Sequence, residues 1–175
     1  MKVAIVSDIH NNEVNLKKVL DYCKENNIRT IICCGDLASM ETLNFTSDNF
    51  SGTIHYTFGN MDEEQLRHYD FEDKYKNIII YKDFGEMEIE NKLIAFVHFP
   101  EKAQQLGETG KYAFVFYGHT HKPWVSSAKA SEDQGQKKCT LLNPGNVAGE
   151  IYPPTFAVWE TENDKFELIR VHDLK

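Results

Sequence analysis

Two histidines separated by one residue, His119 and His121, have the clearest capacity for chemistry in this sequence. They follow the apolar run 113–117, which is typical of a buried strand and stops at Gly118. In extended backbone, side chains two residues apart point the same way, so both imidazoles can serve one site. Taken alone, the pattern is more typical of two exposed loop histidines than of a metal site.

The same spacing recurs after the first predicted strand. Residues 2–7 are predicted to form a buried strand, and Asp8 and His10 follow it directly. Residues 13–26 carry apolar side chains at helical spacing, so strand, loop and helix begin a βα unit. Ligands of open α/β sheets bind beyond the carboxyl ends of the strands, which makes both side chains candidates for a site there. The alternative for Asp8 is a simple turn residue.

Further predicted strands end in residues of the same chemical kind. The strand over 29–34 is followed by Asp36, the strand over 53–58 by Asn60, and a hairpin over 87–97 by His98. Neutral imidazole and oxygen donors suit Mn, Fe, Ni, Co or Zn, and an amide oxygen adds no charge. Each position is a weak signal alone, but the ordered set indicates one metal centre at the strand ends.

The remaining segments are expected to support this site. Residues 39–52 are expected to form a loop with one helical turn that provides a wall of the substrate cleft. A short helix capped by Asp62 is expected over 62–69, and a hairpin tip over 131–138. We also expect a helix over 101–111 and strands over 77–81, 124–128, 139–142, 155–160 and 166–171. No repeat or boundary divides the chain, so residues 1–175 are predicted to form a single domain.

Composition and charge restrict the partners and the compartment. The chain is 41% hydrophobic and 26% charged, as soluble globular proteins are, and its net charge of -8 argues against bulk nucleic acid as a partner. The four cysteines show no metal-binding spacing and no disulfide framework, which favours the cytoplasm. The first apolar run is too short for a signal peptide, and no segment approaches membrane-spanning length, so no membrane partner is expected.

The motifs, taken in chain order, resemble those of the calcineurin-like metallophosphoesterase superfamily. They read Asp-x-His, Gly-Asp, Gly-Asn, His and Gly-His-x-His, and the Asn-Pro-Gly turn at 143–145 is similar to the small bacterial and archaeal phosphodiesterase branch. The resemblance covers the chain from Met1 to about Asn146. It implies a four-layer α/β/β/α sandwich with a dinuclear metal site at the strand carboxyl ends.

The resemblance also implies a ligand set for two divalent transition-metal ions. Mn²⁺ is favoured, and Ni²⁺, Fe²⁺, Co²⁺ or Zn²⁺ are alternatives. Asp36, Asn60 and His98 are the implied catalytic residues, with a metal-bridging hydroxide as the nucleophile. The implied ligands are Asp8, His10 and His121 for one metal, Asn60, His98 and His119 for the other, and Asp36 for both. Two cations outweigh the two carboxylates and the hydroxide, so the site would attract a phosphate despite the acidic surface.

Three positions depart from the family pattern. Met61 stands where many relatives have a histidine that assists the leaving group, which leaves the general acid open. Phe99 follows His98 where glycine is common, and Asn11 follows Asp-x-His where glycine is common. These changes leave the choice of substrate open as well.

The implied function is hydrolysis of a small phosphodiester by a metal-dependent enzyme. The alternatives are a non-catalytic protein-binding scaffold on the same fold, as in the retromer subunit that resembles this family, and a phosphomonoesterase. Every expected ligand position is filled, which favours the enzyme over the scaffold. No arginine adjoins a motif, although Lys122 does, which favours diesters over dianionic monoesters. The oligomeric state stays open, and a homo-oligomer is one possibility.

Overall fold

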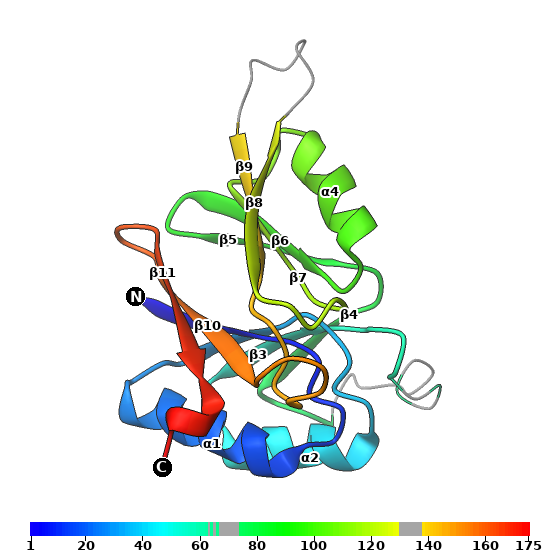
Figure 1. Cartoon of the computed structure of the whole chain (residues 1–175), viewed down its shortest axis with the longest axis vertical. Helices are drawn as coiled ribbons and strands as arrows, with labels where there is room; N and C mark the ends of the chain where they lie inside the picture. Colours follow the sequence, from blue (N-terminus) through cyan, green and yellow to red (C-terminus); the bar gives the residue numbers. More distant parts are fainter. Residues whose placement is uncertain (63, 65, 67–73, 130–137) are drawn as a thin grey trace.

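The computed structural model describes the whole chain except residues 63, 65, 67–73 and 130–137 (Figure 1). Most of the helix expected over 62–69 and nearly all of the hairpin tip expected over 131–138 therefore fall outside the described residues. Two β-sheets form the centre of the described structure. No described helix is long and apolar enough to cross a membrane.

The first sheet has six strands in the order β11-β10-β1-β2-β3-β4, and β1 to β4 run parallel. Its strands are β1 (Lys2–Val6), β2 (Thr30–Cys33), β3 (Thr53–Thr57), β4 (Ile78–Tyr81), β10 (Thr155–Glu160) and β11 (Lys165–Arg170). The strands β10 and β11 form an antiparallel hairpin that pairs with β1. Parallel pairing places the carboxyl ends of β1, β2 and β3 at one edge of the sheet.

The second sheet has five strands in the order β5-β6-β7-β9-β8, with β6, β7 and β9 parallel. Its strands are β5 (Gly85–Ile89), β6 (Lys92–Val97), β7 (Phe114–Tyr117), β8 (Trp124–Lys129) and β9 (Lys138–Asn143). Glu90 and Asn91 form the turn between β5 and β6, and both have positive φ, as a two-residue hairpin turn requires.

Helices cover the outer faces of the two sheets. Figure 1 shows α1 (Glu13–Glu25) and α2 (Met40–Asn49) against the first sheet and α4 (Pro100–Glu108) against the second. The chain ends in a short 3₁₀ helix, η2 (Val171–Asp173), which contacts α1.

Alternating side chains along each strand build three apolar interfaces between these layers. In β1, Ala4 and Val6 pack with α1, whereas Val3 and Ile5 point between the sheets. In β7, Phe114 and Phe116 point between the sheets, and the residues between and after them pack towards α4. Three interfaces separate four layers, so the predicted α/β/β/α sandwich is confirmed.

The expected loop over 39–52 is wrong, because residues 40–49 form the helix α2. Ser39 caps it by accepting the backbone N–H of Thr42, and Leu43 and Thr46 are buried on its inner side. Ser, Thr, Asn and Asp compete for backbone hydrogen bonds, so this composition disguises a helix that tertiary packing stabilises. The cap at Ser39 was the available signal.

Candidate metal centre

Hydrogen bonds from backbone N–H groups connect the loops that follow the strands of both sheets. The N–H groups of Ile9 and His10 both donate to the carbonyl of Asp36, at 2.8 and 3.0 Å. Across the two sheets, the N–H of His119 donates to the carboxylate of Asp8 at 3.1 to 3.2 Å. The strand ends predicted to carry the site therefore meet in three dimensions.

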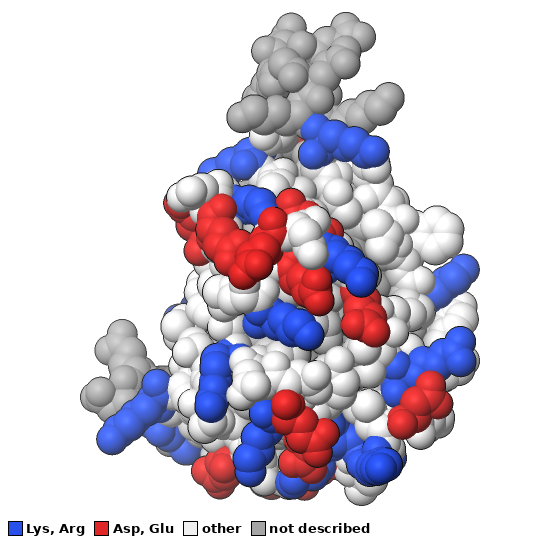
Figure 2. Space-filling model, turned by 90° about the vertical axis from the view of Figure 1, so that its left-hand side faces the viewer, with Lys and Arg blue, Asp and Glu red and all other residues white. Residues whose placement is uncertain are grey.

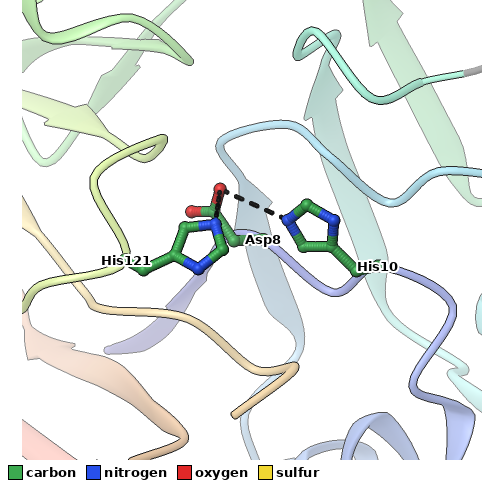
Figure 3. Close-up of side chains that lie close together, drawn as sticks. All are labelled: Asp8, His10 and His121. Atoms are coloured by element: carbon green, nitrogen blue, oxygen red, sulfur yellow. Dashed lines mark ion pairs between the residues drawn. The ribbon is translucent and has the colours of Figure 1, made fainter. Parts of the chain in front are cut away.

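The carboxylate of Asp8 lies between two imidazoles (Figure 3). Its Oδ1 is 3.3 Å from Nε2 of His121 and 3.8 Å from Nε2 of His10. One ligand atom from each of these residues lies within 4.8 Å of the others, so the three side chains can hold one ion. Asp8 is fully buried and His121 is nearly so.

Asp36 connects this group to the remaining predicted residues. Its Oδ2 is 3.7 Å from Nε2 of His10 and 3.3 Å from Nε2 of His98. The amide oxygen of Asn60 is then 3.0 Å from Nε2 of His98 and 2.9 Å from Nδ1 of His119. The structure thus brings all seven predicted residues together, while their assignment as ligands stays a prediction.

The backbone at these positions is not extended, so the reasoning from i, i+2 spacing is wrong. Asp8, His10, His119 and His121 have φ values of 53°, 46°, 69° and 59°, in the left-handed region. Each such residue costs about 1–2 kcal/mol, and strained backbone of this kind concentrates at functional sites. One result is that His119 faces Asn60 whereas His121 faces Asp8.

Burial and ion pairing shift the pKa values in this centre in opposite directions. Burial alone would raise the pKa of Asp8, but His10 and His121 beside it hold that pKa well below its usual range. The Asp8 carboxylate in turn raises the pKa values of His10 and His121. Burial lowers the pKa of His98, but Asp36, Asp8 and the Cys34 carbonyl raise it and the net shift is upward. Each histidine shift therefore has a neighbouring carboxylate as a cause.

Hydrogen bonds behind the site orient two of the imidazoles. Nδ1 of His98 lies 2.9 Å from the carbonyl oxygen of Cys34, and Nδ1 of His121 lies 3.3 Å from that of Glu150. A carbonyl accepts only from a protonated nitrogen, so each Nδ1 carries hydrogen and each Nε2 is the ring nitrogen left available to a metal ion. This is the tautomer that a metal ligand needs.

The turn at 143–146 fixes the loop that carries His119 and His121, a role that sequence reasoning missed. The buried amide of Asn143 donates to the carbonyl of Gly118 at 2.8 Å, and that of Asn146 donates to the carbonyl of His121 at 3.1 Å. The Asn-Pro-Gly pattern was visible in the sequence only as a turn. Nothing local in the sequence indicated which loop those amides would hold.

The residues present fit a divalent cation. Nε2 of His10 is buried and has no hydrogen-bond partner among the described residues, although it points towards the two carboxylates. A buried nitrogen without a partner is costly, and coordination would satisfy its lone pair. Carboxylate, imidazole and amide oxygen together are donors typical of Mn, Fe, Co, Ni or Zn.

The three unusual positions surround this group. Met61 is 55% exposed, and its backbone N–H donates to Oδ1 of Asp36 at 2.7 Å. Phe99 is 40% exposed, with its ring 5.0 Å from that of His98 and 5.1 Å from that of His119. Asn11 accepts the hydroxyl of Thr42 at 2.8 Å, which places the start of α2 beside the site.

Buried carboxylates, imidazoles and an amide oxygen at the strand ends of this sandwich suit metal-dependent hydrolysis of a phosphoric ester. Residues 1–164 match the family model described as the calcineurin-like phosphoesterase superfamily domain. The chain therefore belongs to the calcineurin-like phosphoesterase superfamily, and the resemblance seen in its motifs is confirmed.

Individual relatives extend over nearly the whole chain. Phosphodiesterase MJ0936 from Methanocaldococcus jannaschii is 27% identical over 172 residues, which cover 97% of this chain and 98% of that protein. The structure of an archaeal phosphodiesterase is 28% identical with a TM-score of 0.80, covering 97% of this chain and 99% of that one. The phosphoesterase Yfce from E. coli is 18% identical with a TM-score of 0.69, covering 100% and 96%, and supports the fold alone.

Proposed function

We propose that this protein is a phosphodiesterase that hydrolyses a small phosphodiester with two divalent transition-metal ions, Mn²⁺ being favoured. The observation that carries the proposal is the position of Asp36, whose Oδ2 faces both His10 at 3.7 Å and His98 at 3.3 Å. A carboxylate that lies between two groups of ligands can coordinate two neighbouring cations at once. The similarity to proteins named phosphodiesterases supports the choice of diester.

The proposed ligands divide into two sets that share Asp36. They are Asp8, His10 and His121 in one set and Asn60, His98 and His119 in the other. When bound, divalent cations neutralise the phosphate and lower the pKa of a water molecule towards neutrality. The chain itself keeps Asp8 ionised, holds the Asp8 and Asp36 carboxylates out of bulk water, and places ring nitrogens of His10, His98 and His121 beside them.

The two thiols at the end of β2, those of Cys33 and Cys34, are not placed to compete with activated water. Burial raises the pKa of the Cys33 and Cys34 thiols, and both side chains lie in the apolar interfaces rather than in the centre. Thiols at neutral pH are weak nucleophiles compared with thiolates. The reaction we propose is therefore direct hydrolysis without a phosphoenzyme, with Asp36, Asn60 and His98 as the residues nearest the reacting phosphate.

The charges around the group favour a diester over a monoester. Among the described residues, no lysine or arginine forms an ion pair with Asp8 or Asp36. A monoester dianion carries more negative charge than a diester and gains more from additional protein cations. A scaffold function is not favoured either, since all seven positions keep metal-binding side chains.

The surface supports a small substrate rather than bulk nucleic acid. Figure 2 shows lysine and arginine intermixed with aspartate and glutamate over one face, not a continuous basic stripe. The net charge of -8 points the same way, because phosphate backbones bind to basic faces. Met61 and Phe99 add exposed apolar surface beside the centre, which suits an apolar or aromatic group on the substrate.

We propose further that residues 1–175 act as one metallophosphoesterase domain in the cytoplasm. All four cysteines are free and buried, which suits a reducing compartment. A homo-oligomer stays a hypothesis, and sedimentation of the purified protein tests it.

A matched panel of substrates tests the proposed function. Bis-p-nitrophenyl phosphate, p-nitrophenyl phosphate and a cyclic nucleotide would each be assayed with Mn²⁺, Ni²⁺, Co²⁺, Zn²⁺ and Mg²⁺. We expect kcat/KM for the nitrophenyl diester to exceed that for the nitrophenyl monoester at least tenfold, with Mn²⁺ among the most activating ions. Asp36→Asn, purified in parallel, controls for a contaminating enzyme. A monoester preference, or no hydrolysis with any ion, would contradict the proposal.

A further inference from the structure

A buried carboxylate behind the centre, that of Asp62, has no role in the ligand set. Its side chain is 4% exposed, and its two oxygens accept three backbone N–H groups. Oδ2 accepts from Gly59 at 2.6 Å and from Asp36 at 3.0 Å, and Oδ1 accepts from Ala38 at 2.8 Å. Among the described residues, no lysine, arginine or histidine forms an ion pair with it.

These hydrogen bonds join two loops that leave neighbouring parallel strands. Asp36 and Ala38 follow β2, whereas Gly59 and Asp62 follow β3, and the two strands pair directly. The connection is reciprocal, because the N–H of Met61 donates back to Oδ1 of Asp36 at 2.7 Å. The segment 59–62 therefore holds both the backbone and the carboxylate of Asp36, and it carries Asn60 in its middle.

The loop that Asp62 holds is strained. Gly35, Asp36 and Ala38 have φ values of 102°, 55° and 91°, and the last two are not glycine. Non-glycine residues persist in such conformations only where the surroundings over-determine them. Asp62 accepts from the N–H groups of both strained non-glycine residues, and charge-assisted bonds of this kind are about twice as strong as neutral ones.

The contact between the two loops leaves little room for rearrangement. A Cβ added to Gly59 would overlap the carboxylate of Asp36, and one added to Gly35 would lie 2.7 Å from Nδ1 of His98. The loops can approach this closely only because both positions are glycine. Asp62 supplies acceptors for the N–H groups that this close approach removes from water.

Asp62 is not placed to act as the missing proton donor. Both of its oxygens face backbone N–H groups, and almost none of the side chain reaches solvent. The carboxylate acts on the centre through the two loops and not through the substrate.

We propose that Asp62 is a positioning residue that holds the Asp36 carboxylate and the Asn60 amide at the separation that paired cations require. This inference rests on the proposed dinuclear function for its effect on activity, but not for its effect on the loops. We call the three hydrogen bonds that Asp62 accepts from Asp36, Ala38 and Gly59 the clamp. Loss of the clamp lets the strained loop relax, so Asp36 and Asn60 move apart.

Asp62→Asn is the informative variant, because it keeps the size of the side chain and replaces one acceptor oxygen with an NH₂ group. We expect kcat for bis-p-nitrophenyl phosphate to fall about 10–100-fold with KM changed less than threefold. We also expect the Mn²⁺ affinity measured by calorimetry to fall about tenfold, with part of kcat restored by excess Mn²⁺. Asp62→Ser, which keeps one acceptor, is the second variant should the first fail to fold, and the same ratios apply to it.

Asn77→Ala is the matched control for general destabilisation. The Asn77 amide also connects a loop to its neighbours, donating to the carbonyls of Ser47 and Phe50 at 3.0 and 2.7 Å. Among the described residues it forms no hydrogen bond with the seven candidate ligands. We expect this variant to lose thermal stability while its kcat and Mn²⁺ affinity stay within twofold of wild type. Equal losses of kcat in both variants, in proportion to their thermal stability, would overturn the inference.

Amide hydrogen exchange in the metal-free protein separates the clamp from the proposed function. In Asp62→Asn, the N–H groups of Asp36, Ala38 and Gly59 should exchange at least tenfold faster than in wild type, while those of β7 are unchanged. Unchanged exchange together with wild-type Mn²⁺ affinity would overturn the inference. If exchange is faster in Asp62→Asn but the wild-type protein binds no Mn²⁺, the clamp is retained and the dinuclear function is rejected instead.

Discussion

The substitution Asp36→Asn, compared with Asp8→Asn, examines whether one carboxylate serves both metal positions. Both residues are buried, with 1% and 0% exposure, so differences in solvation are small. Oδ2 of Asp36 faces His10 and His98, one from each proposed ligand set, whereas Oδ1 of Asp8 faces His10 and His121 from a single set. Removing the charge of Asp36 should therefore weaken both metal positions, and removing that of Asp8 mainly one.

The size of the effect follows from the charge that is lost. Asparagine keeps the backbone N–H that Asp62 accepts and an oxygen for the N–H of Met61, so the loop stays in place. Removing one preorganised electrostatic group from an active site costs about 10²–10³ in kcat, or about 2.7–4 kcal/mol. We expect a loss of at least 10²-fold for Asp36→Asn, and a loss about tenfold smaller for Asp8→Asn at saturating Mn²⁺.

The assay combines turnover of bis-p-nitrophenyl phosphate over a range of Mn²⁺ concentrations with calorimetric counting of bound ions. Asp36→Asn should lose affinity at both positions, and Asp8→Asn should keep one position close to wild type. Circular dichroism and thermal melting confirm that both variants fold. Equal and mild losses in the two variants, with matching effects on both positions, would refute a bridging role for Asp36.

Three further predictions concern residues around the centre and in the core. Met61 cannot donate a proton to the leaving group, so alkyl diesters should react about 10²–10⁴-fold more slowly than aryl diesters. The substitution Met61→His should narrow that gap. A shallow dependence of kcat/KM on leaving-group pKa that is unchanged in the variant would show that another acid acts. Cys33→Ala and Cys34→Ala should each keep kcat within twofold and cost about 1 kcal/mol of unfolding free energy in urea titrations, whereas a trapped phosphoenzyme would contradict direct hydrolysis. Burial lowers the pKa of His55, so the unfolded chain binds the proton first as the pH falls below about 6.5. As the pH falls from about 7.5 to about 5.5, the free energy of unfolding of wild type should therefore decrease relative to that of His55→Gln, by at most about 1.4 kcal/mol per pH unit. Parallel curves for the two proteins would refute this.

The sequence was sufficient to predict the layers because the strand pattern is strong. Apolar runs bounded by glycine or polar residues predicted each strand that the structure describes, to within about two residues at most ends. The helix α2 was missed, since its ten residues include Thr, Asn, Ser and Asp, and its stability comes from packing Leu43 and Thr46 against the sheet. Local propensity is a weak guide where tertiary contacts decide.

The site divides in the same way between what is local and what is long-range. The seven candidate residues could be found because parallel strands bring their carboxyl ends to one edge. Their left-handed backbone, the separate directions of His119 and His121, and the clamp at Asp62 could not. Each of these depends on hydrogen bonds between loops far apart in the chain, such as that from His119 N–H to Asp8.

The number of metal ions bound per folded chain tests the central claim most directly. Metal-free protein would be titrated with Mn²⁺, dialysed and analysed for metal content, with the phosphodiesterase rate recorded at each ratio. The predicted result is two ions per chain, with a rate for bis-p-nitrophenyl phosphate that rises as the second ion binds and disappears on chelation. No bound Mn²⁺ or Ni²⁺, or a rate that is indifferent to chelation, would contradict the dinuclear centre built on Asp36.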